Sequence, residues 1–410
     1  MNETISIQQL KSGMFVVEVT KQTGKVKIKN QGWVKTAEAI KKLKKVGVLE
    51  VVIDPSKTLQ KDPPPPVKTE QVDVQNSPED TVHNEPQTPA DPWASSVSFE
   101  KEVGKAQKLY NQAKALQKRA FADIQQGKNI DVKPFKDVAH GFMDSVFRQQ
   151  DALTCLTRMR EKDAYLMEHS INVSILITIF AKHLGFSSDL IHELATGALL
   201  HDIGKVKIDE DILLKPSKLT DEEFEQIQQH AHFSKEILEQ AGLSGIAIEI
   251  AGFHHERIDG SGYPYGKKGD ELSQYARMAA IIDVYDALTA DRVYKTGLTP
   301  IAAFKILKDG AGTAFDDTLV NQFIQCIGVH PVGTLVKLSN HKVGIISRSN
   351  PSNPMRPVVK VFYNAKHSRY IEVEDINLAK GWADVELEAA VKPELFGLDL
   401  MRFFKSSMIG

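Results

Sequence analysis

The sequence predicts a mainly α-helical protein, in which a helical domain is flanked by a small N-terminal α+β module and a small C-terminal β appendage. Three observations support this prediction. Apolar residues recur at helical spacing through most of 98–328, a Pro-rich interval precedes them, and short strand-like segments follow His330. The expected parts are an α+β module at 1–54, a linker at 55–97, long helices at 98–160, a histidine-rich helical domain at 161–328 and a β appendage with a tail at 329–410.

The N-terminal module shows both periodicities in a short span. Strands are predicted at Met14–Val19 and Val48–Ile53, with a short helix at Thr36–Val46 between them. The lysines of that helix fill its solvated side, which accounts for them without a nucleic-acid or membrane role. We therefore expect a small folded module of no assigned chemistry.

The next segment, Pro55–Pro92, has a different composition. Nine of the chain's 18 prolines occur in these 38 residues, among Asp, Glu, Thr, Gln and Asn. Such a segment cannot bury enough apolar area to offset its ordering entropy. An extended, mobile linker is expected here, which would let the N-terminal module move independently.

Two long helices are expected after the linker, at Phe99–Gln126 and Phe135–Met159. In the first of them the spacing leaves either Leu109 or Tyr110 facing inward. These helices can pack on the histidine-rich domain or pair with a second copy of the chain. The sequence does not distinguish these two arrangements.

The overall composition limits the classes of function. Lys and Arg total 51 against 53 Asp and Glu, so the net charge of -2 argues against a nucleic-acid polymer as partner. Cys155 and Cys326 lack metal-ligand spacing and indicate a reducing compartment without disulfides. The first ten residues do not form a signal peptide, and the longest apolar run, Ile175–Ala181, is too short to span a bilayer. A soluble, cytoplasmic protein without membrane attachment is expected.

His201 and Asp202 stand together at the end of an apolar helix that Ser187 or Ser188 would cap. A buried imidazole and a buried carboxylate are costly unless they pair with each other or bind a cation. Taken alone, the two are explained as well by a buried hydrogen bond. However, eight of the 13 histidines fall between His169 and His255, where an even spread would put about three. This clustering favours a metal site.

Further candidate ligands occupy inward faces of the neighbouring predicted helices. His169 takes the place of a core leucine in its helix, and His230 lies on an apolar stripe. His254 and His255 diverge by about 100° on a helix, so they can approach one metal only at a helix end. His232 falls on another face and is excluded from the site.

Two carboxylates and one loop complete the predicted site. Asp283 lies on the inward face of a helix and can supply a remaining carboxylate. Asp286, one turn later, would hydrogen-bond a ligand histidine or instead pair with Arg292. The turn Gly260–Pro264 carries Tyr263, which is suited to lining a pocket, although an ordinary turn accounts for it equally well.

The C-terminal part is predicted to be a small β appendage. Strands are expected at Thr334–Ser339, Val343–Ser349 and Val358–Asn364, separated by Asn-Pro turns. This part carries no recognisable chemistry.

Together these residues closely resemble the HD-GYP family of phosphodiesterases. The likeness covers about Asp151–Gly328, and the joint pattern is specific although each motif alone is weak. A vaguer likeness relates residues 1–54 to a module found ahead of some HD-GYP domains. The matching motifs are His169, His201-Asp202-Ile203-Gly204-Lys205, Lys215-Pro216, His230, His254-His255-Glu256, Asp259-Gly260-Ser261-Gly262-Tyr263-Pro264 and Ile282-Asp283-Val284-Tyr285-Asp286-Ala287-Leu288.

The resemblance implies an HD-type metal-dependent phosphohydrolase domain that binds at least two divalent metals, with Asp202 bridging them. Several imidazoles with carboxylates suit iron or manganese, and zinc less exclusively. The implied ligands are His169, His201 and Asp283 for one metal, and His230, His254 and His255 for the other.

The substrate implied by the resemblance is cyclic di-GMP, hydrolysed to pGpG and often onward to GMP. Two cations about 3.5 to 4 Å apart can hold a bridging water, lower its pKa towards about 7 and stabilise charge on the phosphodiester. Asp202 and Lys205 are the candidate catalytic residues. Lys205 would contact a phosphate oxygen, or would simply lie on the surface at a helix end. Arg257 and Tyr263 are candidates for guanine or phosphate contact.

The chain departs from the family pattern at two places. Some members bind a third metal through a Glu one turn before the first histidine, where this chain has Tyr165, which favours a dinuclear site. Ala231 and Ser234 replace the usual Pro and Gly after the central histidine and leave that ligand intact. Neither departure predicts an inactive protein.

Three other functions stay open at this point. The first is hydrolysis of another cyclic dinucleotide, such as cyclic GMP-AMP. The second is a non-catalytic cyclic-dinucleotide sensor. The complete set of candidate metal ligands argues against the sensor. The third is an iron oxygenase, against which Lys205 and the Gly260–Pro264 loop argue. A homodimer, and a protein partner at the N-terminal module or at that loop, are further expectations.

Overall fold

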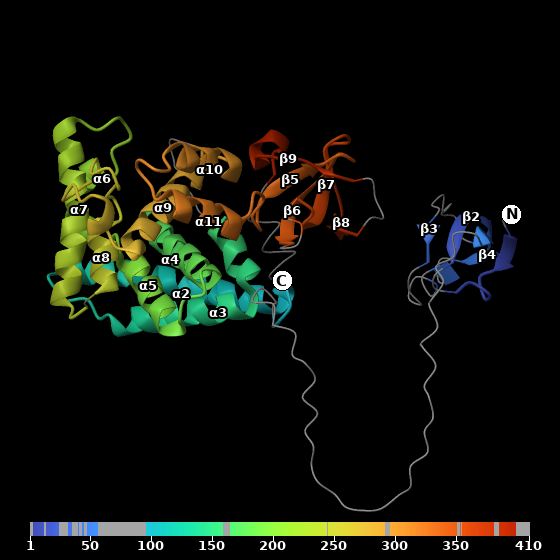
Figure 1. The fold of residues 1–410 in the computed structure, drawn as a ribbon, viewed down its shortest axis with the longest axis horizontal. Coiled ribbons are helices and arrows are strands. Elements are labelled where there is room, and N and C mark those ends of the chain that lie inside the picture. The colour runs from blue at the N-terminus through green and yellow to red at the C-terminus, as the bar shows by residue number, and fades with distance from the viewer. Residues whose placement is uncertain are drawn as a thin grey trace, which may run out of the picture. The chain divides into compact units, whose positions relative to one another are not determined.

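The structure is a computed structural model (Figure 1). The chain forms two compact units, Met1–Pro86 and Gln87–Gly410. The linker predicted at 55–97 and the helix predicted at Thr36–Val46 lie almost wholly outside the described residues. The described residues are 3–11, 14–23, 32–34, 40, 43–44, 47–55, 96–158, 165–243, 245–291, 296–350, 353, 355–380 and 385–398.

The N-terminal unit contains a four-stranded antiparallel sheet in the order β1-β4-β2-β3. The inner strand β4 buries Val48, Val51 and Ile53. Val51 and Ile53 share a face by the strand period of two, and Val48 joins them because the pairing with β2 shifts register between Glu50 and Val48. The two strands that the sequence predicts are confirmed, whereas β1 and β3 were not expected. The strands are β1 Glu3–Ser6, β2 Phe15–Gln22, β3 Gly32–Trp33 and β4 Val48–Ile53.

The second unit is mainly helical, as predicted, and α4 lies at its centre (Figure 1). Every residue from 168 to 181 in α4 is buried, because α3, α5, α9 and α11 surround it. A helix that is buried on all sides must also find partners for its polar side chains, such as Asn172, which accepts the Tyr110 hydrogen bond. The helices are α2 Phe99–Gln125, α3 Lys133–Thr157, α4 Tyr165–His183, α5 Ser188–Leu200, α6 Glu210–Leu213, α7 Asp221–Gln240, α8 Ile246–Phe253, α9 Gln274–Thr289, α10 Pro300–Asp309 and α11 Asp317–Ile327, with the short 3-10 helix η3 at Ile203–Lys207. Among the described helices, none has both the length and the apolar character needed to cross a bilayer.

The long helices α2 and α3 pack against each other, and both contact the histidine-rich helices. Tyr110, and not Leu109, is the buried residue of its turn, with 3% of its surface exposed. Its hydroxyl donates a hydrogen bond to Asn172 Oδ1 at 2.9 Å. Lys114, one turn later, pairs with Glu168 at 2.8 Å. The inward face of α2 is therefore partly polar and reaches the start of α4.

The C-terminal sheet has five antiparallel strands in the order β8-β7-β6-β5-β9 and lies beside α10 and α11 (Figure 1). The three predicted strands are confirmed, and β8 and β9 are additional. The sheet is tied to α3, since the buried Asp151 carboxylate accepts hydrogen bonds from Ser349 N at 3.2 Å and Ser349 Oγ at 3.1 Å. The strands are β5 Leu335–Leu338, β6 Lys342–Arg348, β7 Val358–Asn364, β8 Arg369–Asn377 and β9 Leu387–Ala390, followed by the 3-10 helix η5 at Pro393–Phe396.

Candidate metal centre

Five helices bring the seven predicted ligands to one place in the second unit. Six of the seven residues are buried, and the His255 side chain is 17% exposed. Helix ends position four of them, because α5 ends at Leu200 and α8 at Phe253, immediately before the ligand positions. The ligands come from α4 (His169), from the junction of α5 and η3 (His201 and Asp202), from α7 (His230), from the end of α8 (His254 and His255) and from α9 (Asp283).

The ligand atoms form three overlapping groups, in each of which they lie within 4.8 Å of one another. One of them, His201, Asp202 and His254, shares a histidine with each of the other two groups. These other two groups are the two sets that the family resemblance implies. Cations bound there would lie among nitrogen and carboxylate oxygen donors, which suits transition metals. The two sets are His169, His201 and Asp283, and His230, His254 and His255.

Asp202 lies between the two groups and turns one carboxylate oxygen to each. Its Oδ2 faces His169 Nε2 at 3.8 Å and His201 Nε2 at 3.5 Å. Its Oδ1 faces His230 Nε2 at 3.3 Å and His254 Nε2 at 3.8 Å. A carboxylate in this position is able to bridge two cations.

Backbone carbonyl groups orient three of the imidazoles. The Nδ1 atoms of His201, His230 and His254 lie 2.7, 2.5 and 3.0 Å from the carbonyl oxygens of Ala198, Ile227 and Ala251. Each carbonyl can only accept, so Nδ1 carries the proton and Nε2 keeps its lone pair. All three Nε2 atoms face Asp202.

A carboxylate orients His169 in the same way. Its Nδ1 contacts Asp286 Oδ2 at 2.7 Å, while its Nε2 contacts Asp283 Oδ1 at 2.8 Å. Asp286 therefore forms the predicted hydrogen bond with a candidate ligand histidine, His169. The alternative partner, Arg292, lies outside the described residues.

The donor set fits a bound cation. His201 Nε2 and Asp202 Oδ1 are buried and have no hydrogen-bond partner in the described part of the chain. A buried polar atom without a hydrogen bond lowers the stability of a protein by about 1 to 3 kcal/mol. Cations between the two groups would satisfy both atoms at once.

The charge states also favour cation binding. Burial acts to raise the pKa of Asp202, but Lys205 and His201 hold it well below its usual range. Burial lowers the pKa of both His254 and His255 well below the usual value. The Asp202 carboxylate is thus ionised and the His254 and His255 imidazoles are neutral, and these are the forms that bind metals.

His169 is the exception among the histidines. Burial acts to lower its pKa, but the hydrogen bonds with Asp283 and Asp286 outweigh burial and raise it to about 9. A proton on His169 supplies the positive charge that two neighbouring carboxylates require. A metal ion at Nε2 would supply that charge in its place.

Lys205 lies beside Asp202 on η3. Its Nζ donates to Asp202 Oδ2 at 2.5 Å, and its side chain is 15% exposed. Lys205 is therefore not a surface lysine, and its ammonium group is paired with the Asp202 carboxylate. In this position its ammonium group stabilises the charged form of Asp202 and stands at the edge of the centre.

The structure places the candidate substrate contacts Tyr263 and Arg257 differently. The Tyr263 ring stacks on His255, with centroids 4.6 Å apart and an interplanar angle of 30°. The Arg257 guanidinium stands 5.0 Å from the centroid of Phe315 and donates to the carbonyl of Glu256 at 2.9 Å. Tyr263 thus contacts the candidate metal ligand His255, whereas Arg257 contacts the Glu256 backbone and the Phe315 ring.

The sequence did not reveal what Glu256 does. Its carboxylate is 1% exposed and accepts hydrogen bonds from Tyr265 N at 2.8 Å and Lys267 N at 3.0 Å. A Cβ at Gly262 would lie 2.4 Å from Arg257 N, so the loop passes directly over the backbone after the paired histidines. Glu256 therefore anchors the loop that carries Tyr263.

Ser234, one of the two departures from the family pattern, also has a definite contact. Its Oγ accepts a hydrogen bond from Gly204 N at 2.8 Å. A Cβ at Gly204 would lie 2.2 Å from the carbonyl oxygen of His230, so only glycine fits there. His232 lies outside both ligand groups and contacts Glu236 and Tyr265.

Three families of protein domain match parts of the chain. Residues 150–319 match the HD domain, residues 2–135 match a domain of unknown function (DUF3391), and residues 335–382 match the KOW domain associated with HD domain. The matches therefore extend over the helical domain, the N-terminal part and the C-terminal sheet.

Curated relatives extend the similarity. The chain is 35% identical over 293 residues to a cyclic di-GMP phosphodiesterase of Pseudomonas aeruginosa, which covers 71% of this chain and 70% of that protein. It is 38% identical over 195 residues to a probable cyclic di-GMP phosphodiesterase of Vibrio cholerae, over 43% of this chain and 44% of the relative. It is also 37% identical over 155 residues to the 3'3'-cGAMP-specific phosphodiesterase 3 of the same organism, over 38% of this chain and 34% of the relative.

Proposed function

The chain belongs to the HD-GYP family of cyclic di-GMP phosphodiesterases, and from this we propose that it hydrolyses cyclic di-GMP to the linear dinucleotide pGpG at the candidate metal centre. The observation that carries the proposal is the position of Asp202, whose two oxygens face the two histidine groups separately. The similarity to the Pseudomonas aeruginosa enzyme extends over more than two thirds of each chain, which supports the same activity.

We propose two divalent cations as cofactors, with iron or manganese as the metals. A bound pair lowers the pKa of a coordinated water and stabilises the charge that develops on a phosphodiester. The chain's own residues hold the carboxylates ionised and keep the Nε2 lone pairs directed to one place. The proposed ligands are His169, His201, Asp202, His230, His254, His255 and Asp283.

We propose that Lys205 and Tyr263 both contact the substrate. The Lys205 ammonium can move from Asp202 to a phosphate oxygen within reach of the same carboxylate. The Tyr263 ring, already stacked on an imidazole, offers its other face to a guanine base. Arg257 is a third substrate contact, provided that it leaves the Phe315 ring.

A second candidate substrate is a mixed cyclic dinucleotide. The 37% identity to a cGAMP-specific phosphodiesterase over 155 residues favours this alternative over an unrelated phosphoester. Turnover of cyclic di-GMP and of 3'3'-cGAMP by the same preparation decides between them. Faster hydrolysis of 3'3'-cGAMP would replace the first proposal.

The central experiment combines metal analysis with turnover. Full-length protein purified without oxygen is analysed for metals and assayed for pGpG and GMP by chromatography. We expect about two metals per chain in the wild type, and loss of metal and of turnover in Asp202→Ala and His230→Ala. His232→Ala, two residues from His230 on the same helix, is the matched control and should keep both. Full turnover in Asp202→Ala would refute the proposal.

Partners beyond the substrate are also proposals. We propose a homodimer through the long helices, and a protein partner at the N-terminal module or at the Gly260–Pro264 loop. The exposure of Ser261 and of the adjacent Tyr265 supports only the partner at the loop. Light scattering of the full chain measures the first. A protein partner at the loop would be released by Tyr265→Ala.

A further inference from the structure

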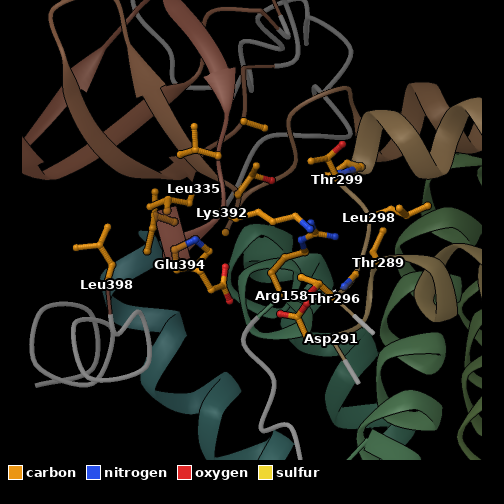
Figure 2. A pocket seen from close by; sticks show the side chains of 18 of the residues that line it. Arg158, Thr289, Asp291, Thr296, Leu298, Thr299, Leu335, Lys392, Glu394 and Leu398 are labelled. Carbon is orange, nitrogen blue, oxygen red and sulfur yellow. Dashed lines mark hydrogen bonds between the residues drawn. The ribbon is translucent and has the colours of Figure 1, made fainter. Parts of the chain in front are cut away.

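A cavity of about 440 Å³ lies between the helical domain and the C-terminal sheet, and none of the seven candidate ligands is among its described lining residues (Figure 2). Its walls come from the end of α3, the end of α9, the segment before α10, strand β5 and the turn of η5. Cavities of about 300 to 1,000 Å³ at domain boundaries are typical of small-molecule sites. The size and place of this cavity therefore suit a ligand other than the substrate.

Two cationic side chains meet in the cavity. Figure 2 shows the Arg158 guanidinium and the Lys392 ammonium pointing toward each other from opposite walls. Asp291 and Glu394 also line the cavity. Within the part of the chain that the structure describes, none of these four side chains forms an ion pair. Two converging cations without a paired anion favour a phosphate group between them.

The backbone fixes the position of Arg158. Gly333 has a φ of +87°, and a Cβ there would lie 3.0 Å from Arg158 Cβ and Cγ. The aliphatic part of the arginine side chain therefore lies flat on the glycine, and a side chain at residue 333 would displace it. The arginine is thus placed by the junction between the helices and the sheet.

A buried hydroxyl provides independent evidence for a ligand. Thr334 is 5% exposed, lines the cavity, and its Oγ has no hydrogen-bond partner among the described residues. Helix α10 also begins at the cavity wall, with Thr299 as its N-terminal cap, so the positive end of its dipole faces the same space. A polar ligand would satisfy the hydroxyl.

One side of the cavity is apolar. Leu335 and Leu398 lie there, whereas Leu298 lines the opposite side, beyond the charged side chains (Figure 2). A bare phosphate ion would leave these leucines without contact. A ligand that also has a flat or apolar portion would cover them.

We propose that this cavity binds a small phosphate-bearing organic molecule of the size of a nucleoside monophosphate. Its phosphate lies between Arg158 and Lys392, its hydroxyl or amino groups donate to Asp291 and Glu394, and its ring packs on the leucines. This site is separate from the metal centre, so the proposal does not depend on the proposed phosphodiesterase activity.

Titration calorimetry of the full-length protein with GMP tests the proposal, with inorganic phosphate as a second probe. We expect Lys392→Ala to weaken GMP binding by about tenfold, since it removes one charged contact to the phosphate. Lys392→Arg should keep most of the affinity. Lys366→Ala, an exposed lysine in the turn after β7, is the matched control and should bind as the wild type does.

Two readouts separate this site from the metal centre. Turnover of cyclic di-GMP without added GMP should be unchanged in Lys392→Ala, because Lys392 lies outside the catalytic residues. GMP binding of equal strength in Lys392→Ala and wild type, or no binding at millimolar GMP, would overturn the proposal. Phosphate that binds as tightly as GMP would also overturn it, because the apolar wall would then contribute nothing.

Discussion

Asp202 is surrounded by four imidazole nitrogens and one ammonium group, all within 3.8 Å of its carboxylate. Removing a carboxylate of this kind leaves buried nitrogen donors without a counter-charge. At the residue scale the centre therefore depends on one carboxylate for its position and on the surrounding groups for its charge. The same reasoning extends to residues that only touch a ligand.

Asp286 is the clearest case of such a residue. We expect Asp286→Asn to weaken metal binding by about 10- to 100-fold, because the amide no longer holds the His169 proton at Nδ1. Competition with a coloured chelator measures the dissociation constant. The exposed Asp144→Asn is the control and should leave it unchanged. Unchanged metal affinity in Asp286→Asn would show that His169 does not depend on this contact.

Tyr263 provides a second prediction at this scale. Burial raises the pKa of its hydroxyl, so the ring stays neutral and acts by stacking. Since base stacking contributes about 1 to 3 kcal/mol, Tyr263→Ala should lower kcat/KM by about tenfold, mainly through KM, and Tyr263→Phe should retain the wild-type value. Tyr265→Ala, two residues later and 43% exposed, is the control. Equal values for Tyr263→Ala and wild type would remove the ring from the substrate site.

At the scale of elements, α2 contacts the helices that carry the proposed metal ligands, and it does so through polar groups. Lys114 pairs with Glu168, the residue next to His169, and Gln117 Nε2 donates to the carbonyl of Leu199, two residues before His201. Helix α2 therefore supports two ligand-bearing helices at the residues beside their ligands.

A double-mutant cycle measures this contact. Lys114→Ala leaves the Glu168 carboxylate, which is 2% exposed, without this counter-charge, and we expect it to destabilise the protein by about 2 to 3 kcal/mol. Adding Glu168→Gln should recover part of that loss. Urea unfolding followed by circular dichroism provides the four free energies. Strictly additive effects would show that the two side chains do not interact.

The pair of α2 with α3 has a pH-dependent contribution. Burial acts to raise the pKa of Glu102, but hydrogen bonds from Arg148 and Ser145 lower it overall below its ordinary 4.5. Stability from a lowered carboxyl pKa is present above the ordinary value and is lost as the pH falls through the lowered one.

Glu102→Gln tests this contribution. We expect a loss of about 1 kcal/mol at pH 7, a modest value because Arg148 is 38% exposed. The difference from wild type should shrink as the pH falls below 4.5. Glu100→Gln, on the exposed face of the same helix, should show no such difference. A loss independent of pH would show that the charge of Glu102 is not its cause.

At the scale of the molecule, the metal centre joins five helices that are distant in sequence. A metal ion that binds only the folded state adds about 2.7 kcal/mol to the free energy of unfolding when its free concentration is 100 times its dissociation constant. We therefore expect manganese to raise the unfolding temperature of the chelator-treated protein by about 5 °C. Differential scanning calorimetry measures this shift, and Asp202→Ala should not show it. An equal shift in both proteins would place the metal effect elsewhere.

Much of the architecture could be predicted because it follows local periodicity. The strands Val48–Ile53 and Val358–Asn364 were predicted to the residue, since each has several large apolar side chains within a few positions. Strand β8 was not predicted, because Arg369–Asn377 is charged and largely exposed at the edge of its sheet. Edge strands are often polar, and their pairing then depends on the neighbouring strand and not on their own sequence.

The sequence alone determined which residues could form a metal site, because an imidazole at an inward position of an apolar helix is costly to bury without a cation or a hydrogen-bond partner. Only the tertiary structure decided how those residues meet. Examples are the division of the Asp202 oxygens between two groups, the contact of Lys205 with Asp202, and the anchoring of the loop by Glu256. His169 and Asp286 are 117 residues apart, and local patterns set which way each helix face points but not the distance between two helices. That distance depends on the packing of the whole core around α4.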